Sequence, residues 1–220
     1  MVEAIELIEE QVIVVGVDVG GPRKGFHAVA LRDTAYLDRT ESCSPEEIFK
    51  WCQTTGAKIV AVDAPCCWSS TGKARAAECA LAAMKIFSFA TPARENAVKK
   101  PFYQWMLSGA ALYTLLQYEF PLFRGVRRSG RMCIETFPQA VACALAGMIL
   151  SAKKKKENRL EVLRSEGLDT RELSNIDYID AALCALAALY MYRDRVSCYG
   201  NPSEGFIVVP KVEEPRLRVT

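Results

Sequence analysis

The sequence contains a single histidine, His27, and none of its nine cysteines belongs to a CxxC pair. A structural zinc site therefore has no recognisable ligand set, because such sites use closely spaced cysteine and histidine ligands. Nucleophilic catalysis of the Cys/His or Ser/His/Asp type would depend on His27 alone, which disfavours it. An odd number of cysteines without a secretory signal is typical of reduced thiols in a reducing compartment.

Long apolar runs and a targeting signal are also missing. The longest apolar stretch, residues 181–192, has twelve residues, fewer than the roughly 18 that a membrane-spanning helix needs. The chain starts with MVEAIE, which is acidic and lacks the basic region of a signal peptide. We therefore expect a soluble, cytoplasmic protein without a membrane partner.

Charge is distributed unevenly along the 220 residues, a length that fits a single domain over residues 1–220. The net charge is only +2, but residues 94–164 carry 13 Lys/Arg against 5 Asp/Glu. This region includes four consecutive lysines at 153–156 and the aromatic residues Phe102, Tyr103 and Trp105. Such a composition is typical of nucleic-acid binders, although a solvated helix face explains the lysine run equally well.

Hydrophobic periodicity predicts an α/β protein with a mixed five-stranded sheet flanked by helices. Strands are expected over residues 11–19, 26–31, 35–39, 58–63 and 131–137, with a short terminal strand over 206–209. Helices are expected over 45–55, 138–148, 152–166 and 175–192, and a helical insertion at about 66–128 separates the fourth and fifth strands. The crossover helix and the apolar central strands predict the order 3-2-1-4-5, with strands 1 and 4 parallel neighbours.

Acidic residues occupy positions where a carboxylate is costly. Asp18 and Asp63 end two buried apolar strands, where an unpaired charge would carry a large desolvation penalty. Asp180 lies on the apolar stripe of the last helix, and Asp177 lies one turn earlier, where a helix-capping role is as good an explanation as function. Glu135 ends the fifth strand.

Together these carboxylates predict an oxygen-rich site for Mg²⁺ or Mn²⁺. Two such ions about 4 Å apart can activate a water and stabilise the leaving oxygen during phosphodiester hydrolysis. Cys66 and Cys67 follow Asp63 closely and could be reactive, but we favour a packing role for them, as for Cys79, Cys143 and Cys184.

Four motifs resemble the domain-of-unknown-function family 429: GVDVGG at 16–21, VDAPCCW at 62–68, ETFP at 135–138 and IDYIDAALCALAA at 176–188. The elements Arg75-x-x-Glu78 and Thr91-Pro92-x-Arg94 resemble the insertion of that family. The family is described as predicted nucleases of RNase H-like fold, so the resemblance implies that fold here.

The acids are also similar in arrangement to those of Holliday-junction resolvases of the RNase H-like superfamily. This likeness implies that Asp18, Asp63, Asp177 and Asp180 are metal ligands. One departure is that such resolvases commonly have glutamate where this chain has Asp63. Glu135 is a further candidate catalytic residue, and the candidates for substrate binding are Arg75, Arg94 and Arg159.

The favoured function is a metal-dependent nuclease that hydrolyses phosphodiester bonds in DNA or RNA. One alternative is a nucleotide-binding ATPase or kinase-like protein, because residues 18–21 also resemble the phosphate loop of actin-like ATPases. Those proteins have two such lobes, for which this chain is too short, and the GxxxxGK[ST] loop is missing. The other alternative is a non-catalytic nucleic-acid-binding module of the same fold. A homodimer is left open.

Overall fold

The computed structural model describes residues 11–127 and 129–212. The acidic start of the chain and Arg128, the last residue of the predicted insertion, lie outside this part. Within it, the strands are β1 (Ile13–Val19), β2 (Phe26–Arg32), β3 (Ala35–Ser42), β4 (Ile59–Asp63), β5 (Met132–Glu135), β6 (Val196–Asn201) and β7 (Gly205–Pro210). The helices are α1 (Pro45–Thr54), α2 (Ala76–Ala83), α3 (Arg94–Val98), α4 (Gln104–Leu116), α5 (Pro138–Ala146), α6 (Lys155–Ser165) and α7 (Ile176–Tyr192), with short 3₁₀ turns at Pro101–Tyr103 and Ala152–Lys154.

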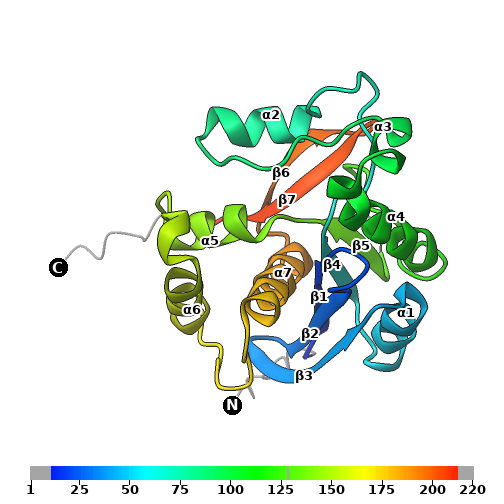
Figure 1. The fold of residues 1–220 in the computed structure, drawn as a ribbon. Helices are drawn as coiled ribbons and strands as arrows, with labels where there is room; N and C mark the ends of the chain where they lie inside the picture. The colour runs from blue at the N-terminus through cyan, green and yellow to red at the C-terminus, as the bar shows by residue number, and fades with distance from the viewer. Residues whose placement is uncertain (1–10, 128, 213–220) are drawn as a thin grey trace, which may run out of the picture.

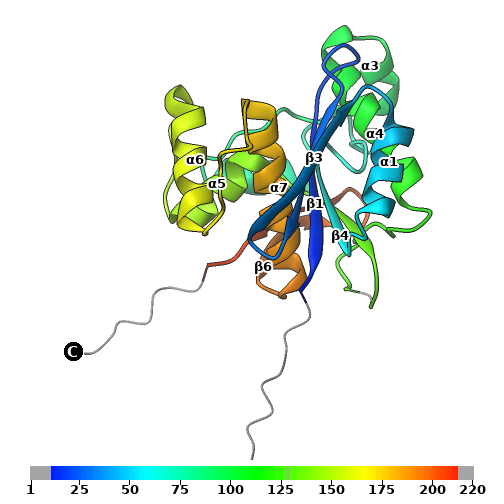
Figure 2. The same cartoon turned by 90° about the horizontal axis from the view of Figure 1, so that it is seen from below.

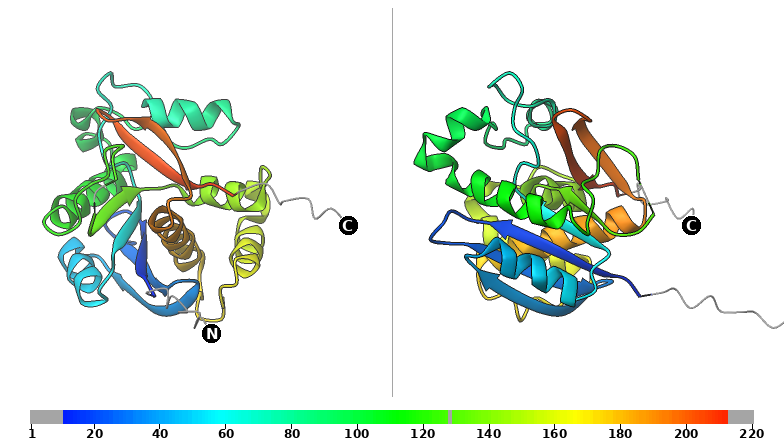
Figure 3. Two further views of the ribbon diagram at one scale, coloured as in Figure 1. Left: turned by 180° about the vertical axis from the view of Figure 1, so that it is seen from behind. Right: turned by 90° about the vertical axis from the view of Figure 1, so that its right-hand side faces the viewer.

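The seven strands form one mixed sheet in the order β3-β2-β1-β4-β5-β7-β6. The first five strands take the predicted order, and β1 and β4 are parallel neighbours, as predicted. The prediction of five strands is wrong, because a β6–β7 hairpin extends the sheet beyond β5. Figure 3 shows this hairpin beside α2, at the edge opposite β3. Residues 206–209 were expected as a strand, whereas β6 reads VSCYGN, a partly exposed segment with little apolar patterning.

Helices cover both faces of the sheet. Figures 1 and 2 show α1 and α4 on one face and α7, with α5 and α6 beyond it, on the other. On the first face, the core contains Val15, Val17, Val60 and Val62, whereas alternate residues of the same strands pack against α7. This division follows from the two-residue period of a strand, with both faces apolar because both are covered.

Helix α7 lies unusually close to β1 because Gly16 has no side chain. A Cβ atom at Gly16 would lie 2.0 Å from the carbonyl oxygen of Ala181 and 2.1 Å from the amide nitrogen of Ala185. Small residues along this face of α7 complete the contact. The consequence is that the first two turns of α7 lie directly over the end of β1.

The connection between β4 and β5 carries α2, α3 and α4, so its helical character is as predicted. The amino end of α1 is also as its sequence indicates, with the Ser44 hydroxyl accepting from the Glu47 amide and Pro45 in the first turn. In the part of the chain described, no helix is long and apolar enough to cross a membrane.

Candidate metal centre

Two aspartates lie side by side at the carboxyl ends of neighbouring strands. Asp18 of β1 and Asp63 of β4 are register partners in the parallel ladder. Each alternates onto the face that packs against α7, as Gly16 and Ala61 do two residues earlier. The sheet therefore presents both carboxylates beneath the start of α7. Asp18 is 6% exposed, and Asp63 is partly buried.

The amino-terminal turns of α7 add two further aspartates. Asn175 caps the helix, its side-chain oxygen accepting from the amides of Asp177 and Tyr178. The Asp177 side chain is not used for capping and is directed to the side chains of Lys24 and His27. One turn later, Asp180 is 4% exposed. The structure thus brings all four predicted aspartate ligands to one end of the sheet.

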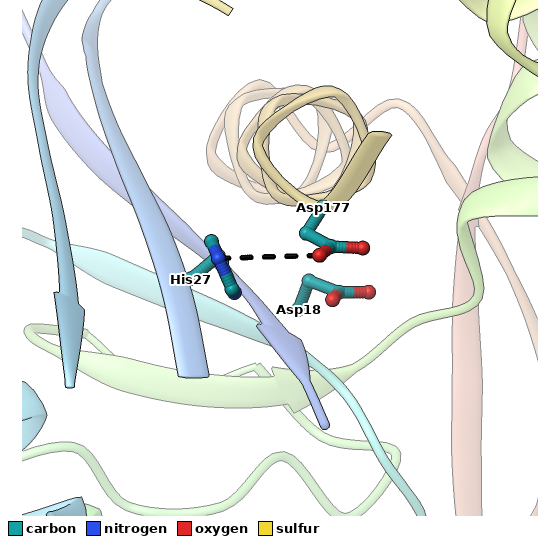
Figure 4. A group of neighbouring side chains, drawn as sticks. All are labelled: Asp18, His27 and Asp177. Atoms are coloured by element: carbon teal, nitrogen blue, oxygen red, sulfur yellow. Dashed lines mark ion pairs between the residues drawn. The ribbon is translucent and has the colours of Figure 1, made fainter. Parts of the chain in front are cut away.

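His27 joins this group from β2. It pairs with Asp18 across the antiparallel β1–β2 ladder, and Figure 4 shows Asp18, His27 and Asp177 as neighbours below the start of α7, with the ion pair between His27 and Asp177 dashed. One ligand atom from each of the three lies within 4.8 Å of the others. His27 Nε2 is 3.9 Å from Asp177 Oδ2 and 3.3 Å from Glu41 Oε2, while Nδ1 has no hydrogen-bond partner among the described residues.

Basic side chains balance part of the negative charge. The Lys24 ammonium is 2.7 Å from Asp177 Oδ1 and 3.6 Å from Asp18 Oδ2. Asp180 is engaged on both oxygens, by Arg159 on one and by Lys155 at 2.9 Å on the other. Asp18 Oδ2 is buried without a hydrogen-bond partner in the part of the chain described.

Burial and neighbouring charges disfavour the charged forms of Asp18 and Asp63. Burial, reinforced by the charge of Asp180, raises the pKa of Asp18 from 3.8 to about 7. Burial and the neighbouring charge of Asp18 likewise raise the pKa of Asp63 well above its ordinary value. A raised carboxylate pKa in a cleft is typical of a functional site. A cation bound between the two would relieve this repulsion.

Glu135 lies on the other face of the sheet. It pairs with Val62 in the β4–β5 ladder and takes the same side as Val62, away from Asp63. Its carboxylate accepts from Arg75 at 2.5 and 2.9 Å and from the Cys66 amide at 2.8 Å. Arg75, which is 1% exposed, also binds Glu78 at 2.8 Å. The structure therefore places Glu135 in a buried ion cluster, and this cluster lines the same cavity as the four aspartates.

Residues 16–204 match the model of a family described as "Protein of unknown function (DUF429)". The chain belongs to this family. The family assignment made from the four sequence motifs is thereby confirmed.

Solved structures of two RuvC chains are similar to this DUF429 member. "Thermus thermophilus RuvC structure" is 16% identical, with coverage of 86% of this chain and 99% of that chain and a TM-score of 0.47. "T. thermophilus RuvC in complex with Holliday junction substrate" is 17% identical, with coverage of 83% and 96% and a TM-score of 0.44. Curated proteins give no match to the chain.

The predicted substrate-binding arginines of the DUF429 chain have different surroundings. Arg94 is exposed at the start of α3. Arg75 and Arg159 are buried and bound to carboxylates, Arg159 also donating to Gln139 at 3.1 Å. Of the three, Arg94 is the one whose side chain the structure leaves open to solvent.

Lys24, His27 and Lys155 also belong to the group, although the sequence alone did not indicate them. His27 could have been found by pairing β1 with β2 across the tight turn between them, which sets it opposite Asp18. Lys155 lies in the lysine run that sequence analysis attributed to a polyanion surface or a solvated face. No local sequence pattern indicates which carboxylate a lysine on another helix will pair with.

A cavity of about 350 Å³ adjoins the carboxylates. Its lining includes the four aspartates, the ion cluster of Arg75, Glu78 and Glu135 and, on the side of the β4–β5 connection, Phe89 and Trp105. The Phe89 ring is largely exposed and lies 5.1 Å from that of Phe102, centroid to centroid. The cavity is therefore lined by charged side chains on one side and by aromatic rings on the other.

The glycine turn after β1 uses its amides internally. The Gly20 amide donates to the Gly25 carbonyl at 2.8 Å, and the amides of Lys24 and Gly25 donate to the Gly21 carbonyl, both at 2.9 Å. These amides are not available to a phosphate group. Within residues 18–21, the Gly20 amide is thus engaged inside the turn. The turn also positions Lys24 against Asp18 and Asp177.

Proposed function

We propose that this chain is a divalent-metal-dependent nuclease that hydrolyses phosphodiester bonds in nucleic acid. The observation that carries the proposal is the pairing of Asp18 with Asp63 at adjacent strand ends, beneath Asp177 and Asp180 of α7. The strand order β3-β2-β1-β4-β5, with β1 and β4 parallel, supports the RNase H-like fold that the motifs imply.

The donor set suits a hard divalent cation. Carboxylate oxygens are the ligands that Mg²⁺ and Mn²⁺ prefer, and an imidazole is acceptable to Mn²⁺. Asp18 Oδ2 is buried and lacks a hydrogen-bond partner among the described residues, and its ion pair with Lys24 is long, at 3.6 Å, so a cation could compete for this oxygen. We assign Asp18, Asp63 and Asp177 as the ligands that hold the cation, with His27 beside them.

Asp180, the fourth aspartate, is already engaged by two basic side chains. Its two oxygens pair with Arg159 and Lys155, so it would bind a metal only after one of these cations withdraws. Lys155 is the exposed partner of the two. Its ammonium would then be free to pair with a phosphate oxygen of the substrate, as would that of Lys24 after release from Asp177.

When bound, the divalent cations supply an activated water and stabilise the leaving oxygen. The chain's own residues position the substrate. Phe89 and Trp105 line the cavity on one side, where an unpaired base could stack on an aromatic ring. Exposed basic residues at Arg94 and along residues 153–156 extend the positive surface toward a nucleic-acid backbone.

Cleavage assays test the proposal directly. Labelled single-stranded DNA, duplex DNA, RNA and a four-way DNA junction would be incubated with the protein in Mg²⁺, Mn²⁺ or EDTA. We expect metal-dependent cleavage by the wild type and its loss in Asp18→Asn, because a neutral amide cannot replace the negative charge that the Asp18 carboxylate would offer a cation. Asp38→Asn, an exposed aspartate on β3, is the matched control and should retain activity.

Thermal melting separates a catalytic role for Asp18 from a structural one. The wild type should melt at a higher temperature with Mn²⁺ than with EDTA, since a ligand that binds only the folded state stabilises it. Asp18→Asn should lose this gain while remaining folded. An equal metal-induced shift in both proteins would remove Asp18 from the site and contradict the proposal.

A further inference from the structure

Two adjacent cysteines lie where the chain leaves β4. The sulfur atoms of Cys66 and Cys67 are 3.9 Å apart, with the Cys66 thiol donating to Cys67. Nη1 of Arg124 donates to Cys67 Sγ at 3.0 Å. We propose that this pair is an oxidation site, in which Cys67 is the nucleophilic thiolate and Cys66 is the thiol that resolves it. The proposal is independent of the nuclease activity.

The surroundings of Cys67 favour its charged form. The hydrogen bond from Cys66 and the charge of Arg124 outweigh burial and lower the pKa of Cys67 to about 6. The residue is partly exposed, so a small oxidant in solution can reach it. A partly exposed thiol beside an arginine is the setting in which reactive cysteines occur.

The surroundings of Cys66 favour its neutral form. Its donation to Cys67, together with burial and the negative charge of Glu135, raises the pKa of Cys66 well above its ordinary value. The charged groups that face the pair are Arg124 from the segment before β5, Glu135 from β5 and Arg75 from the turn before α2. One thiolate and one thiol therefore lie in contact.

The β6–β7 hairpin packs against the cysteine pair at Gly205. A Cβ atom at Gly205 would lie 2.4 Å from Cys66 Sγ and 3.6 Å from Cys67 Sγ. Arg124 also donates to the Pro202 carbonyl of the same hairpin at 3.3 Å. Glycine at position 205 thus leaves room for both sulfurs. The bond to Pro202 holds the Arg124 guanidinium where it can donate to Cys67 Sγ.

The chemistry needs a hydroperoxide as oxidant. The Cys67 thiolate attacks hydrogen peroxide, the O–O bond breaks, and hydroxide leaves to give the sulfenic acid. The Cys66 sulfur then attacks the Cys67 sulfur, its proton joins the departing hydroxyl as water, and a Cys66–Cys67 disulfide forms. The two thiols are oxidised by two electrons and one peroxide is reduced to water.

Alkylation of the full-length protein by iodoacetamide tests the reactivity of Cys67. Peptide mass spectrometry would compare its rate with that of Cys43, an exposed cysteine. At pH 6.5 we expect Cys67 to react about fourfold faster than an ordinary exposed thiol. The rate gained from its larger thiolate fraction outweighs the rate lost through its lower intrinsic nucleophilicity. At pH 9 the order should reverse. Arg124→Gln should slow Cys67 at pH 6.5 and leave Cys43 unchanged.

A limited dose of hydrogen peroxide tests the resolving role of Cys66. In the wild type, the peptide that contains both cysteines should lose two hydrogen atoms. In Cys66→Ser, Cys67 should instead carry one oxygen that a sulfenic-acid reagent captures, and Cys67→Ser should leave position 66 unmodified at the same dose. The proposal is overturned if folded wild type alkylates Cys67 no faster than Cys43 at pH 6.5, or if Arg124→Gln leaves that rate unchanged.

Discussion

Replacing Asp18 by asparagine should stabilise the metal-free protein at neutral pH. Burial and the charge of Asp180 raise the pKa of Asp18 from 3.8 to about 7, so between these values the native state holds a proton that the unfolded chain has lost. The free energy of unfolding therefore falls as pH rises from about 4 to 7. Three pKa units at about 1.4 kcal/mol each correspond to about 4 kcal/mol.

Asparagine carries no charge, so it avoids the free energy that burial of a charged carboxylate at position 18 requires. In EDTA, Asp18→Asn should exceed the wild type in free energy of unfolding by up to about 4 kcal/mol at pH 8, and the difference should vanish below pH 4. Urea denaturation followed by circular dichroism at several pH values measures it. Asp38→Asn should stay within about 0.5 kcal/mol of the wild type. An Asp18→Asn protein that is less stable than the wild type at pH 8 would refute the reasoning.

Three further substitutions test other parts of the account. Arg75→Met should lower the free energy of unfolding by about 3–5 kcal/mol, because it leaves Glu78 and Glu135 buried without their cation. Gly16→Ala should destabilise by at least about 1–3 kcal/mol, since its methyl group would collide with the backbone of α7. Replacing Lys153, Lys154 and Lys156 by serine should weaken nucleic-acid binding and flatten its salt dependence, because fewer counterions are released.

Each of these three predictions has a control variant or an outcome that would contradict it. For Arg75, the control is Arg171→Met, which breaks an exposed ion pair with Asp169 and should cost little. For Gly16, the control is Gly21→Ala, where no atom lies within 4 Å of the added Cβ atom; equal melting temperatures for the two variants would contradict the close approach of α7. An unchanged salt slope would assign the lysines to a solvated helix face.

The central part of the fold could be predicted because its signals are local. The apolar runs of β1 and β4 indicate buried strands, strand alternation turns Asp18 and Asp63 to one face, and helical spacing brings Asp180 to the same side as the apolar stripe of α7. Strand β6 was missed because its residues are partly exposed and include glycine and asparagine. Its place in the sheet depends on pairing with β7.

The partners of the charged residues could not be predicted for a different reason. Arg75 meets Glu135 across sixty residues of sequence, and Lys155 reaches Asp180 from a separate helix. Ion pairs of this kind leave no periodic pattern in the sequence. Glu135 lines the cavity of the aspartates with which it was grouped, but its pairing with Arg75 could not be predicted. The position of Lys24 depends on the fold of the glycine turn, which the sequence motif alone does not specify.

Diffraction from crystals soaked in Mn²⁺, with data collected at the manganese absorption edge, tests the central claim most directly. We predict an anomalous peak between the carboxylates of Asp18 and Asp63, with Asp177 or His27 completing the coordination, and its loss in Asp18→Asn crystals soaked identically. Absence of a peak at these carboxylates in wild-type crystals, with Lys24 still paired to Asp177 and Lys155 to Asp180, would contradict it.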